Sequence, residues 1–290
     1  MIPAAELLAM PPRETVASHD ARTTILYALG LGAASENATD PSELQYVYEE
    51  GLRALPTMPL VLAYPGFYLK EPQYRVDWAK VLHGEQRLTL HRAVPVAATI
   101  RSILTFDEIY DKGPDKGALL FATRKLYDMA GGDLVATLGS TSFLRGDGGC
   151  GGSEDSPARP HPVPDRTPDF VVDLPTRGDQ ALLYRLSGDL NPLHADPAVA
   201  ATAGFERPIL HGMATFGIVG RAVVRAICGN DPSRLRQLDA RFSSPVFPGE
   251  TIRTEIWKDG PGTGSLRARV VERDVVVLSN GRCAFMEGKI

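Results

Sequence analysis

Residues 184–220 read YRLSGDLNPLHADPAVAATAGFERPILHGMATFGIVG, and the expected architecture and chemistry of the chain follow from them. Within six residues this segment carries an acid, an amide and an imidazole: Asp189, Asn191 and His194. Gly188 and Pro192 interrupt regular structure around these groups, so we expect an irregular loop. An apolar segment typical of a buried helix begins at His211 and Gly212. Polar groups on a loop beside a helix N-terminus can move protons and stabilise an oxyanion.

Each of these residues, taken singly, also has an ordinary structural role. Asp189 could close a turn, and Asn191-Pro192 is a common turn dipeptide. A lone His194 is more often a packed or surface histidine than a catalyst. The combination is more specific, because Tyr-x-Leu-Ser-Gly-Asp-x-Asn-Pro-Leu-His, from Tyr184 to His194, resembles the signature of the MaoC-like hydratases. Within them it is most similar to the (R)-specific 2-enoyl-CoA hydratase 2 family.

The composition describes an ordinary globular chain. Its 290 residues suffice for one large or two modest domains, and 43% of them are apolar. The net charge of −4 argues against a nucleic-acid-binding domain, which is usually basic. No apolar run reaches the length of a transmembrane helix, so we expect no membrane insertion and a cytoplasmic protein. The three cysteines lie far apart without zinc-site spacing, so we expect reduced thiols and no metal.

The texture of the sequence divides the chain into three regions. We expect an N-terminal domain over residues 1–145, a glycine- and proline-rich linker over residues 146–168 and a catalytic C-terminal domain over residues 169–290. Residues 1–20 are interpreted as a leader without regular structure, and residues 41–53 as a helix. Short runs rich in Thr, Val, Ile and Leu, separated by turn signals, predict antiparallel strands in both domains. These patterns alone indicate an α+β chain.

The two domains repeat the same order of elements and share local sequence similarity. ILYALGLG at residues 25–32 aligns with LLYRLSGD at residues 182–189, and residues 92–101 resemble residues 241–253 with a small gap. In this alignment the positions opposite the acid, the amide and the imidazole are Gly32, Ala34 and Asn37. We therefore expect one active site per chain, built on the C-terminal domain. The N-terminal domain would be free to widen into a pocket for a bulky substrate.

The resemblance also implies a fold. The family has the hot-dog fold, in which a strongly curved antiparallel sheet wraps a helix. Because the similarity extends over most of the chain, it implies an α+β double hot dog, with two helix-wrapped antiparallel sheets in one chain. The similarity is specific at residues 184–194 and 208–216, good at residues 241–251 and loose in the N-terminal half.

Hydration of a conjugated thioester sets three chemical requirements. Water must lose a proton as it attacks the β-carbon, the α-carbon must gain a proton, and the carbonyl must be stabilised as an enolate. The resemblance implies that Asp189 and His194 share the acid and base work on one water. It further implies that Asn191 orients the water and the carbonyl, and that Gly212 donates its main-chain N–H to the carbonyl oxygen. Whether Asp189 or His194 delivers the α-proton stays open, and no metal or redox cofactor is required.

The substrate that the resemblance implies is an acyl-coenzyme A thioester. The reaction would convert trans-2-enoyl-CoA to (R)-3-hydroxyacyl-CoA reversibly, and the catalytically empty N-terminal domain favours long, branched or steroid-type acyl chains. The candidate partners of the coenzyme A phosphates are basic residues that could equally be ordinary surface charges: Arg207, Arg221, Arg225, Arg241 and Lys258. We select Arg207 and Arg241 among them.

Two other functions stay open at this point. A hot-dog acyl-CoA thioesterase needs a carboxylate and a water but not the whole string from Asp189 to His194. A non-catalytic acyl-CoA-binding subunit is expected to lose the motif in both halves, whereas one half of this chain retains it. By analogy with other hot-dog proteins we expect a homodimer. The natural acyl group, the choice between coenzyme A and acyl carrier protein, and the physiological direction are not encoded in any motif that we find.

Overall fold

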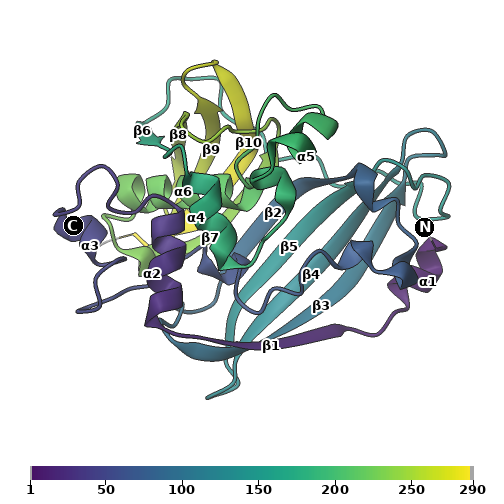
Figure 1. Cartoon of the computed structure of the whole chain (residues 1–290), viewed down its shortest axis with the longest axis horizontal. Coiled ribbons are helices and arrows are strands. Elements are labelled where there is room, and N and C mark those ends of the chain that lie inside the picture. Colours follow the sequence, from purple (N-terminus) through teal and green to yellow (C-terminus); the bar gives the residue numbers. More distant parts are fainter. Residues whose placement is uncertain (1, 288–290) are drawn as a thin grey trace.

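One antiparallel sheet runs through the whole molecule (Figure 1). A computed structural model describes residues 2–287 of the chain. Among these residues the sheet has ten strands in the order β1-β3-β4-β5-β2-β7-β10-β9-β8-β6. The strands are β1 (Arg13–His19), β2 (Val81–Leu90), β3 (Ala98–Asp111), β4 (Ala118–Asp128), β5 (Leu134–Leu144), β6 (Phe170–Pro175), β7 (Leu235–Phe242), β8 (Thr251–Gly260), β9 (Thr263–Val270) and β10 (Val275–Phe285).

The strand order of one half is repeated in the other. Read from the outer edge inward, the N-terminal half runs β1-β3-β4-β5-β2 and the C-terminal half runs β6-β8-β9-β10-β7. The innermost strands pair with each other in antiparallel register, with Glu85 opposite Arg241 and Thr89 opposite Gln237. The two expected sheets are therefore joined edge to edge into one. In Figure 1 the blue and teal strands of the first half lie beside the green and yellow strands of the second.

The helices are short except for one. They are α1 (Ala4–Leu8), α2 (Ala21–Gly30), α3 (Pro41–Leu44), α4 (Gln180–Tyr184), α5 (Pro197–Thr202) and α6 (Gly212–Ile227). The 3-10 turns are η1 (Met58–Leu60), η2 (Tyr68–Lys70), η3 (Pro72–Tyr74), η4 (Trp78–Lys80), η5 (Arg185–Ser187), η6 (Pro192–His194) and η7 (Pro232–Arg234). None of the helices within residues 2–287 is long and apolar enough to cross a membrane.

Helix α6 forms the core of the C-terminal half, as its apolar sequence predicts. The strands β6, β7 and β8 contact it. Phe216, Val219 and Val223 are fully buried, and each such side chain contributes about 1.5–3 kcal/mol of burial free energy. The helix ends where Gly229 (φ 63°) and Asn230 (φ 59°) take left-handed conformations, which terminate helices. Its first residue, Gly212, has no side chain that could cover the main-chain N–H groups at the helix N-terminus.

The N-terminal half has no helix of comparable length in the corresponding interior. The predicted helix over residues 41–53 is wrong beyond Leu44, because the chain continues as turns that end at Gly51, whose φ of 70° is left-handed. Residues 54–63 are nevertheless largely buried and irregular. The buried Arg124 donates to the main-chain oxygens of Leu62 at 2.7 Å and Pro59 at 3.0 Å. A cation therefore satisfies carbonyls that a helix would have paired internally.

Residues 2–20 are not the unstructured leader that the sequence indicated. Strand β1 pairs with β3, with Arg13 opposite Leu104 and His19 opposite Ala98, and it forms the outer edge of the sheet. Its sequence, RETVASH, lacks the alternation of apolar residues by which strands are usually recognised. The strand is stabilised by pairing with a segment far along the chain, which local sequence does not reveal.

Residues 146–168 contain no helix or strand, but the structure holds them at several points. The Asp111 carboxylate accepts from the main-chain N–H of Gly149 at 2.9 Å and of Gly151 at 3.0 Å. Farther along, a ring nitrogen of His161 lies 2.7 Å from the Ser265 hydroxyl. The segment thus follows a fixed path from one half of the sheet to the other.

Candidate active site

Glycine, proline and asparagine residues determine the path of the loop between η5 and η6. Gly188 takes φ 119°, a left-handed conformation that ends η5 and that side chains disfavour. Pro192 then begins η6, where its missing N–H costs nothing. The Asn191 side-chain oxygen caps this turn by accepting from Leu193 N–H at 3.2 Å. Asp189 is thereby placed at the tip of the loop, and the histidine at the end of η6 faces inward.

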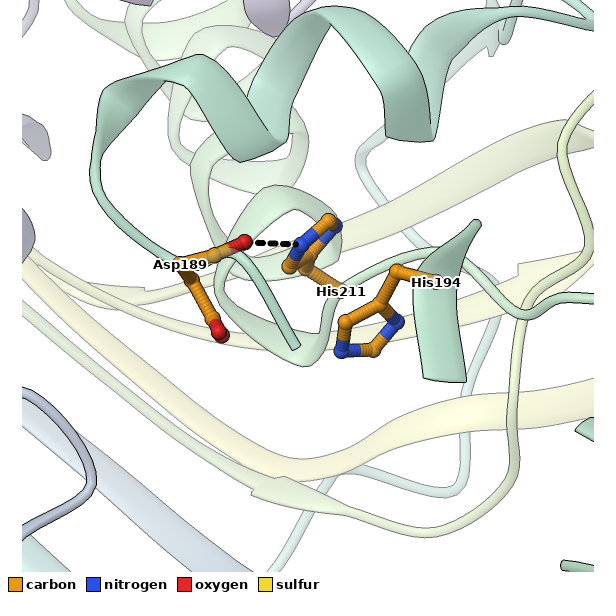
Figure 2. Close-up of side chains that lie close together, drawn as sticks. All are labelled: Asp189, His194 and His211. Carbon is orange, nitrogen blue, oxygen red and sulfur yellow. Dashed lines mark hydrogen bonds between the residues drawn. The ribbon is translucent and has the colours of Figure 1, made fainter. Parts of the chain in front are cut away.

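The side chains of Asp189, His194 and His211 lie close together beside this loop (Figure 2). One side-chain atom of each lies within 4.8 Å of the others. His194 and His211 are buried, with 8% and 1% of their surfaces exposed, whereas Asp189 is partly exposed. The rings of His194 and His211 stack, with centroids 3.6 Å apart and planes 28° from parallel. Two histidines and a carboxylate therefore lie together beside the start of α6.

Main-chain carbonyls fix the hydrogen positions on both rings in their neutral forms. His194 Nδ1 lies 2.8 Å from the Ile209 carbonyl oxygen, and a carbonyl only accepts, so Nδ1 carries the hydrogen. His194 Nε2 is then a free proton acceptor. His211 Nε2 likewise donates to the main-chain oxygen of Asp189 at 3.1 Å. The structure thus presents a basic nitrogen on one ring and uses the other ring to hold the loop.

Burial keeps both rings neutral near pH 7. Desolvation lowers the pKa of His194, opposed by the hydrogen bond to Ile209 and by the charge of Asp189. Desolvation also lowers the pKa of His211 to about 4, with the neighbouring His194 adding to the effect. A neutral imidazole with a free nitrogen can accept a proton, whereas an imidazolium cannot.

The separation between Asp189 and His194 suits one bridging water. A water that accepts or donates hydrogen bonds of about 2.8 Å to two partners at a near-tetrahedral angle spans about 4.6 Å. One carboxylate oxygen of Asp189 and one ring nitrogen each of His194 and His211 lie within 4.8 Å of one another. In Figure 2 the Asp189 carboxylate lies to the lower left of the His211 ring and the His194 ring to its lower right. The arrangement is therefore compatible with a single water held by both groups.

Gly212 is the first residue of α6, and no side chain caps this helix start within the described part of the chain. The helix N-terminus consequently offers main-chain N–H groups and a positive dipole end. A Cβ on Gly212 would lie 3.1 Å from Cε1 of Phe242, which is tighter than ordinary contact. Glycine at this position therefore lets the main chain approach the aromatic ring and leaves room beside the N–H groups.

The N-terminal half also reaches this region, which the sequence did not indicate. The His83 ring on β2 lies 4.9 Å from the Phe242 ring, centroid to centroid. Burial raises the pKa of Tyr64 to about 12, and the negative charge of Asp189 contributes to this rise. Both side chains remain partly open to solvent. They come from segments more than 100 residues before the motif, so no local pattern could have identified them.

The side chains of the other predicted site residues have other contacts in the structure. Asn191 is on the exposed part of the loop, where its side-chain oxygen serves as the cap of η6. Arg207 lies over the Phe247 ring at 4.9 Å and 3.5 Å from Glu206. Arg241 is exposed on β7 and forms no ion pair with any residue that the structure describes. The roles of these residues stay predictions.

The remaining arginine and lysine candidates are engaged elsewhere. Arg221 is buried on α6 and forms an ion pair of 2.6 Å with Glu43, so this candidate is not available to bind a phosphate. Arg225 pairs with Glu36 at 3.2 Å. Lys258 lies over the Phe170 ring at 5.3 Å.

A carboxylate and two histidines are also common metal ligands, but their geometry here is a poor match for a metal. Each ring already uses one nitrogen on a main-chain carbonyl. A metal binds in the plane of an imidazole, at about 2.0–2.1 Å from nitrogen for zinc. Two rings that stack at 3.6 Å direct their remaining lone pairs along nearly parallel planes, so these do not converge on one ion.

Comparison with known families accounts for both halves. The model of the MaoC like domain matches residues 160–280, and that of the MFE-2 hydratase 2 N-terminal domain matches residues 18–146. The 3-hydroxyacyl-thioester dehydratase Y of Mycobacterium tuberculosis is 40% identical, over 92% of this chain and 93% of that protein. The chain belongs to the MaoC-like hydratase 2 family. A peroxisomal enoyl-CoA hydratase 2 of Arabidopsis thaliana is 36% identical, over 94% of this chain and 92% of its own length.

Solved structures agree with this family and with the expected fold. A MaoC-like dehydratase from Phytophthora capsici superposes with a TM-score of 0.87 at 34% identity, over 98% of this chain and 99% of that one. A Mycobacterium tuberculosis protein described as a double hot dog superposes with a TM-score of 0.61 at 17% identity, over 98% of both chains, and this similarity concerns the fold alone. The predicted double hot dog is thereby confirmed.

Proposed function

We propose that this chain catalyses the reversible hydration of trans-2-enoyl-CoA to (R)-3-hydroxyacyl-CoA. As a member of the hydratase 2 family it is a hydro-lyase, since its relatives are named enoyl-CoA hydratase 2 and 3-hydroxyacyl-thioester dehydratase. The observation that carries the mechanism is the position of the Asp189 carboxylate and the free Nε2 of His194 beside the N-terminus of α6. Asp189 and His194 can accept and return the protons, and the N-terminus of α6 can stabilise the enolate oxygen.

In the proposed mechanism one water is held between Asp189 and His194. As its oxygen bonds to the β-carbon, the water gives a proton to this pair, and the π electrons move to the thioester oxygen. The N–H of Gly212 stabilises the resulting enolate oxygen. A proton from the pair then reaches the α-carbon and restores the thioester carbonyl, so H and OH are added from the same side. Asn191 orients the water in this scheme, and all steps are proton transfers that need no metal or redox cofactor.

The substrate assignment rests on the contrast between the two halves. Opposite the catalytic loop the N-terminal half carries Gly32, Ala34 and Asn37. It also replaces a long central helix by short turns, and Tyr64 and His83 extend toward the site from it. We infer that long, branched or steroid-type acyl chains lie along this half. Arg207 and Arg241 are our candidates for the phosphates of coenzyme A, and a cytoplasmic homodimer stays a prediction.

The decisive experiment follows the absorbance of the conjugated thioester after enzyme is added to a medium-chain trans-2-enoyl-CoA. A chiral 3-hydroxyacyl-CoA dehydrogenase then reports the configuration of the product. We expect loss of the enoyl signal and formation of the (R)-alcohol. Release of free coenzyme A without hydration would indicate a thioesterase instead. No change with short, long and steroid-type substrates, together with retained acyl-CoA binding, would indicate a binding subunit.

A further inference from the structure

His211 lies between the two groups that would activate the water. Its Nε2–H donates to the main-chain oxygen of Asp189 at 3.1 Å, and its face stacks on the ring of His194 at 3.6 Å. It is 99% buried and directly precedes Gly212, so it belongs to the turn that starts α6. Figure 2 shows its ring above that of His194, with one nitrogen directed at Asp189.

We propose that His211 is a positioning residue that holds the main chain of Asp189 and covers one face of the His194 ring. This inference rests on the proposed function, because it assigns His211 a task in aligning the groups that hold the water. His211 does not itself contact the substrate in this scheme. It acts through its two neighbours.

The hydrogen bond from His211 restrains a loop that has few other restraints. Asp189 follows a glycine with φ 119°, and its own carboxylate oxygen accepts only a weakly placed bond from Asn191 N–H at 3.2 Å. Besides His211, the Arg185 guanidinium supports this loop by donating to the Leu190 carbonyl at 2.9 Å. A buried donor on the main chain of the acid itself fixes where its carboxylate can reach.

The stacked ring controls the protonation of His194 by excluding water from it. Desolvation lowers the pKa of His194 and the Arg185 guanidinium adds to this effect, and together they outweigh the Ile209 carbonyl and the Asp189 carboxylate, which raise it. If His211 is replaced by a smaller side chain, water reaches the exposed face and desolvation weakens. The pKa of His194 should then rise toward its ordinary value near 6.5.

Packing alone does not account for a histidine at this position. His211 Nδ1 is buried and has no hydrogen-bond partner within residues 2–287. The Tyr184 hydroxyl nearby is also buried without a partner, and the Tyr184 ring lies 5.0 Å from that of His211. A buried nitrogen without a hydrogen-bond partner lowers the stability of the fold. A phenylalanine would fill the same space and would have no such nitrogen. The polar ring is retained because its other nitrogen performs the task described above.

Two variants separate the two contacts of His211. His211→Phe keeps an aromatic face over His194 but loses the donor to Asp189. His211→Gln keeps a donor of similar reach but loses the ring. His91→Gln is the matched control, since His91 is an exposed histidine that bonds only to the Thr137 hydroxyl at 2.9 Å.

We expect the two variants to fail in different ways. His211→Phe should lower kcat on an enoyl-CoA about tenfold with little change in KM, the scale of one lost buried hydrogen bond. His211→Gln should raise the pH midpoint of His194 in an NMR titration of the free protein. The acid limb of kcat/KM should move to higher pH in the same variant, because the base must be neutral. The control should match the wild type in all three readouts.

The titration needs no substrate, so it distinguishes a failure of this inference from a failure of the proposed function. An inactive wild type whose His194 midpoint still rises in His211→Gln would remove the hydration proposal and leave the positioning role. An unchanged midpoint in His211→Gln together with an unchanged kcat in His211→Phe would overturn the role. If the variants do not fold, ring ¹⁵N shifts of the wild type serve instead. They should show hydrogen on Nδ1 of His194 and Nε2 of His211, and the opposite tautomer on either ring would overturn the inference.

Discussion

The two halves of the molecule have the same strand order but different interiors. In the C-terminal half the sheet wraps α6, whose 16 residues fill the concave face. In the N-terminal half the same place holds irregular chain that Arg124 stabilises through main-chain carbonyls. A hot-dog sheet therefore tolerates two fillings. Only the half with the long helix also provides a free helix N-terminus at the site.

The loops that follow α4 and α2 show the same contrast on a smaller scale. After α4 the chain carries the catalytic candidates, whereas after α2 the Leu31 carbonyl accepts from the buried guanidinium of Arg221 at 2.6 Å. The same guanidinium pairs with Glu43 at 2.6 Å, and Glu43 accepts from Ala34 N–H at 3.0 Å. The loop after α4 carries the candidate catalytic residues, whereas the loop after α2 binds Arg221 of α6 and so links the two halves of the molecule.

The sharpest test of this contrast removes the polar groups from each loop in turn. Asp189→Asn and His194→Ala should each lower kcat about 10²–10⁴-fold, the usual contribution of a general acid or base, while the fold stays intact. Asn37→Ala, at the position opposite His194, should leave kcat within about twofold. Steady-state kinetics with an enoyl-CoA and circular dichroism provide the measurements. A catalytic variant with near-wild-type kcat would remove that residue from the mechanism.

The next largest effect concerns the buried ion pair. Glu43→Gln leaves Arg221 buried without its anion, so we expect a loss of about 3–5 kcal/mol in the free energy of unfolding. The double variant Glu43→Leu with Arg221→Met should recover most of this loss, because no charge is then left alone. Denaturant unfolding measures both. If Glu43→Gln unfolds at the wild-type midpoint, the pair does not fasten the two halves.

A smaller effect is expected at the start of α6. Gly212→Ala brings a Cβ to 3.1 Å from the Phe242 ring and must displace one of them by a few tenths of an ångström. The donor N–H moves with the main chain, so kcat should fall about tenfold, less than for complete loss of an oxyanion donor. Phe242→Leu in the same protein should restore part of the loss. An equal kcat in the single and double variants would show that crowding by Phe242 is not the cause.

The smallest effect should come from the candidate phosphate contacts. Arg241→Ala and Arg207→Ala should each raise KM for an enoyl-CoA about two- to fivefold without changing kcat, because a surface cation contributes binding only. The difference from wild type should shrink as salt is added. Arg225→Ala is the matched control, since Arg225 already pairs with Glu36. A kcat effect in the Arg241 variant would instead indicate a role near the reacting atoms.

The sequence predicted the parts of the site that local geometry determines. Asp189 and His194 lie within six residues of each other, next to a glycine and a proline, and the longer string from Tyr184 to His194 made this spacing informative through its family resemblance. The start of α6 at Gly212 was predicted from the apolar segment that follows it. The stacking of His211 on His194 depends on how α5 and the following loop return the chain to the site. Tertiary packing of this kind leaves no periodic pattern in the sequence.

Two structural errors of the sequence reading have physical causes. Strand β1 was missed because its stability comes from pairing with β3, and its half-exposed residues do not alternate. Arg221 was considered as a surface cation although it interrupts an otherwise apolar helical run, Phe216 to Val224. A single charge in such a run indicates a buried partner. That signal was present but could not name Glu43, which lies 178 positions earlier.

The pairing of β2 with β7 has a consequence for how such a protein is made. Either half alone would present its innermost strand as a row of unsatisfied hydrogen-bonding groups, and exposed edges of that kind recruit other chains into aggregates. Because both halves belong to one polypeptide, strands β2 and β7 meet at an effective concentration in about the millimolar range. This is far above the concentration of any other protein molecule that could pair with either strand. The covalent connection through residues 146–168 thus favours the pairing of β2 with β7 over the pairing of either strand with another molecule.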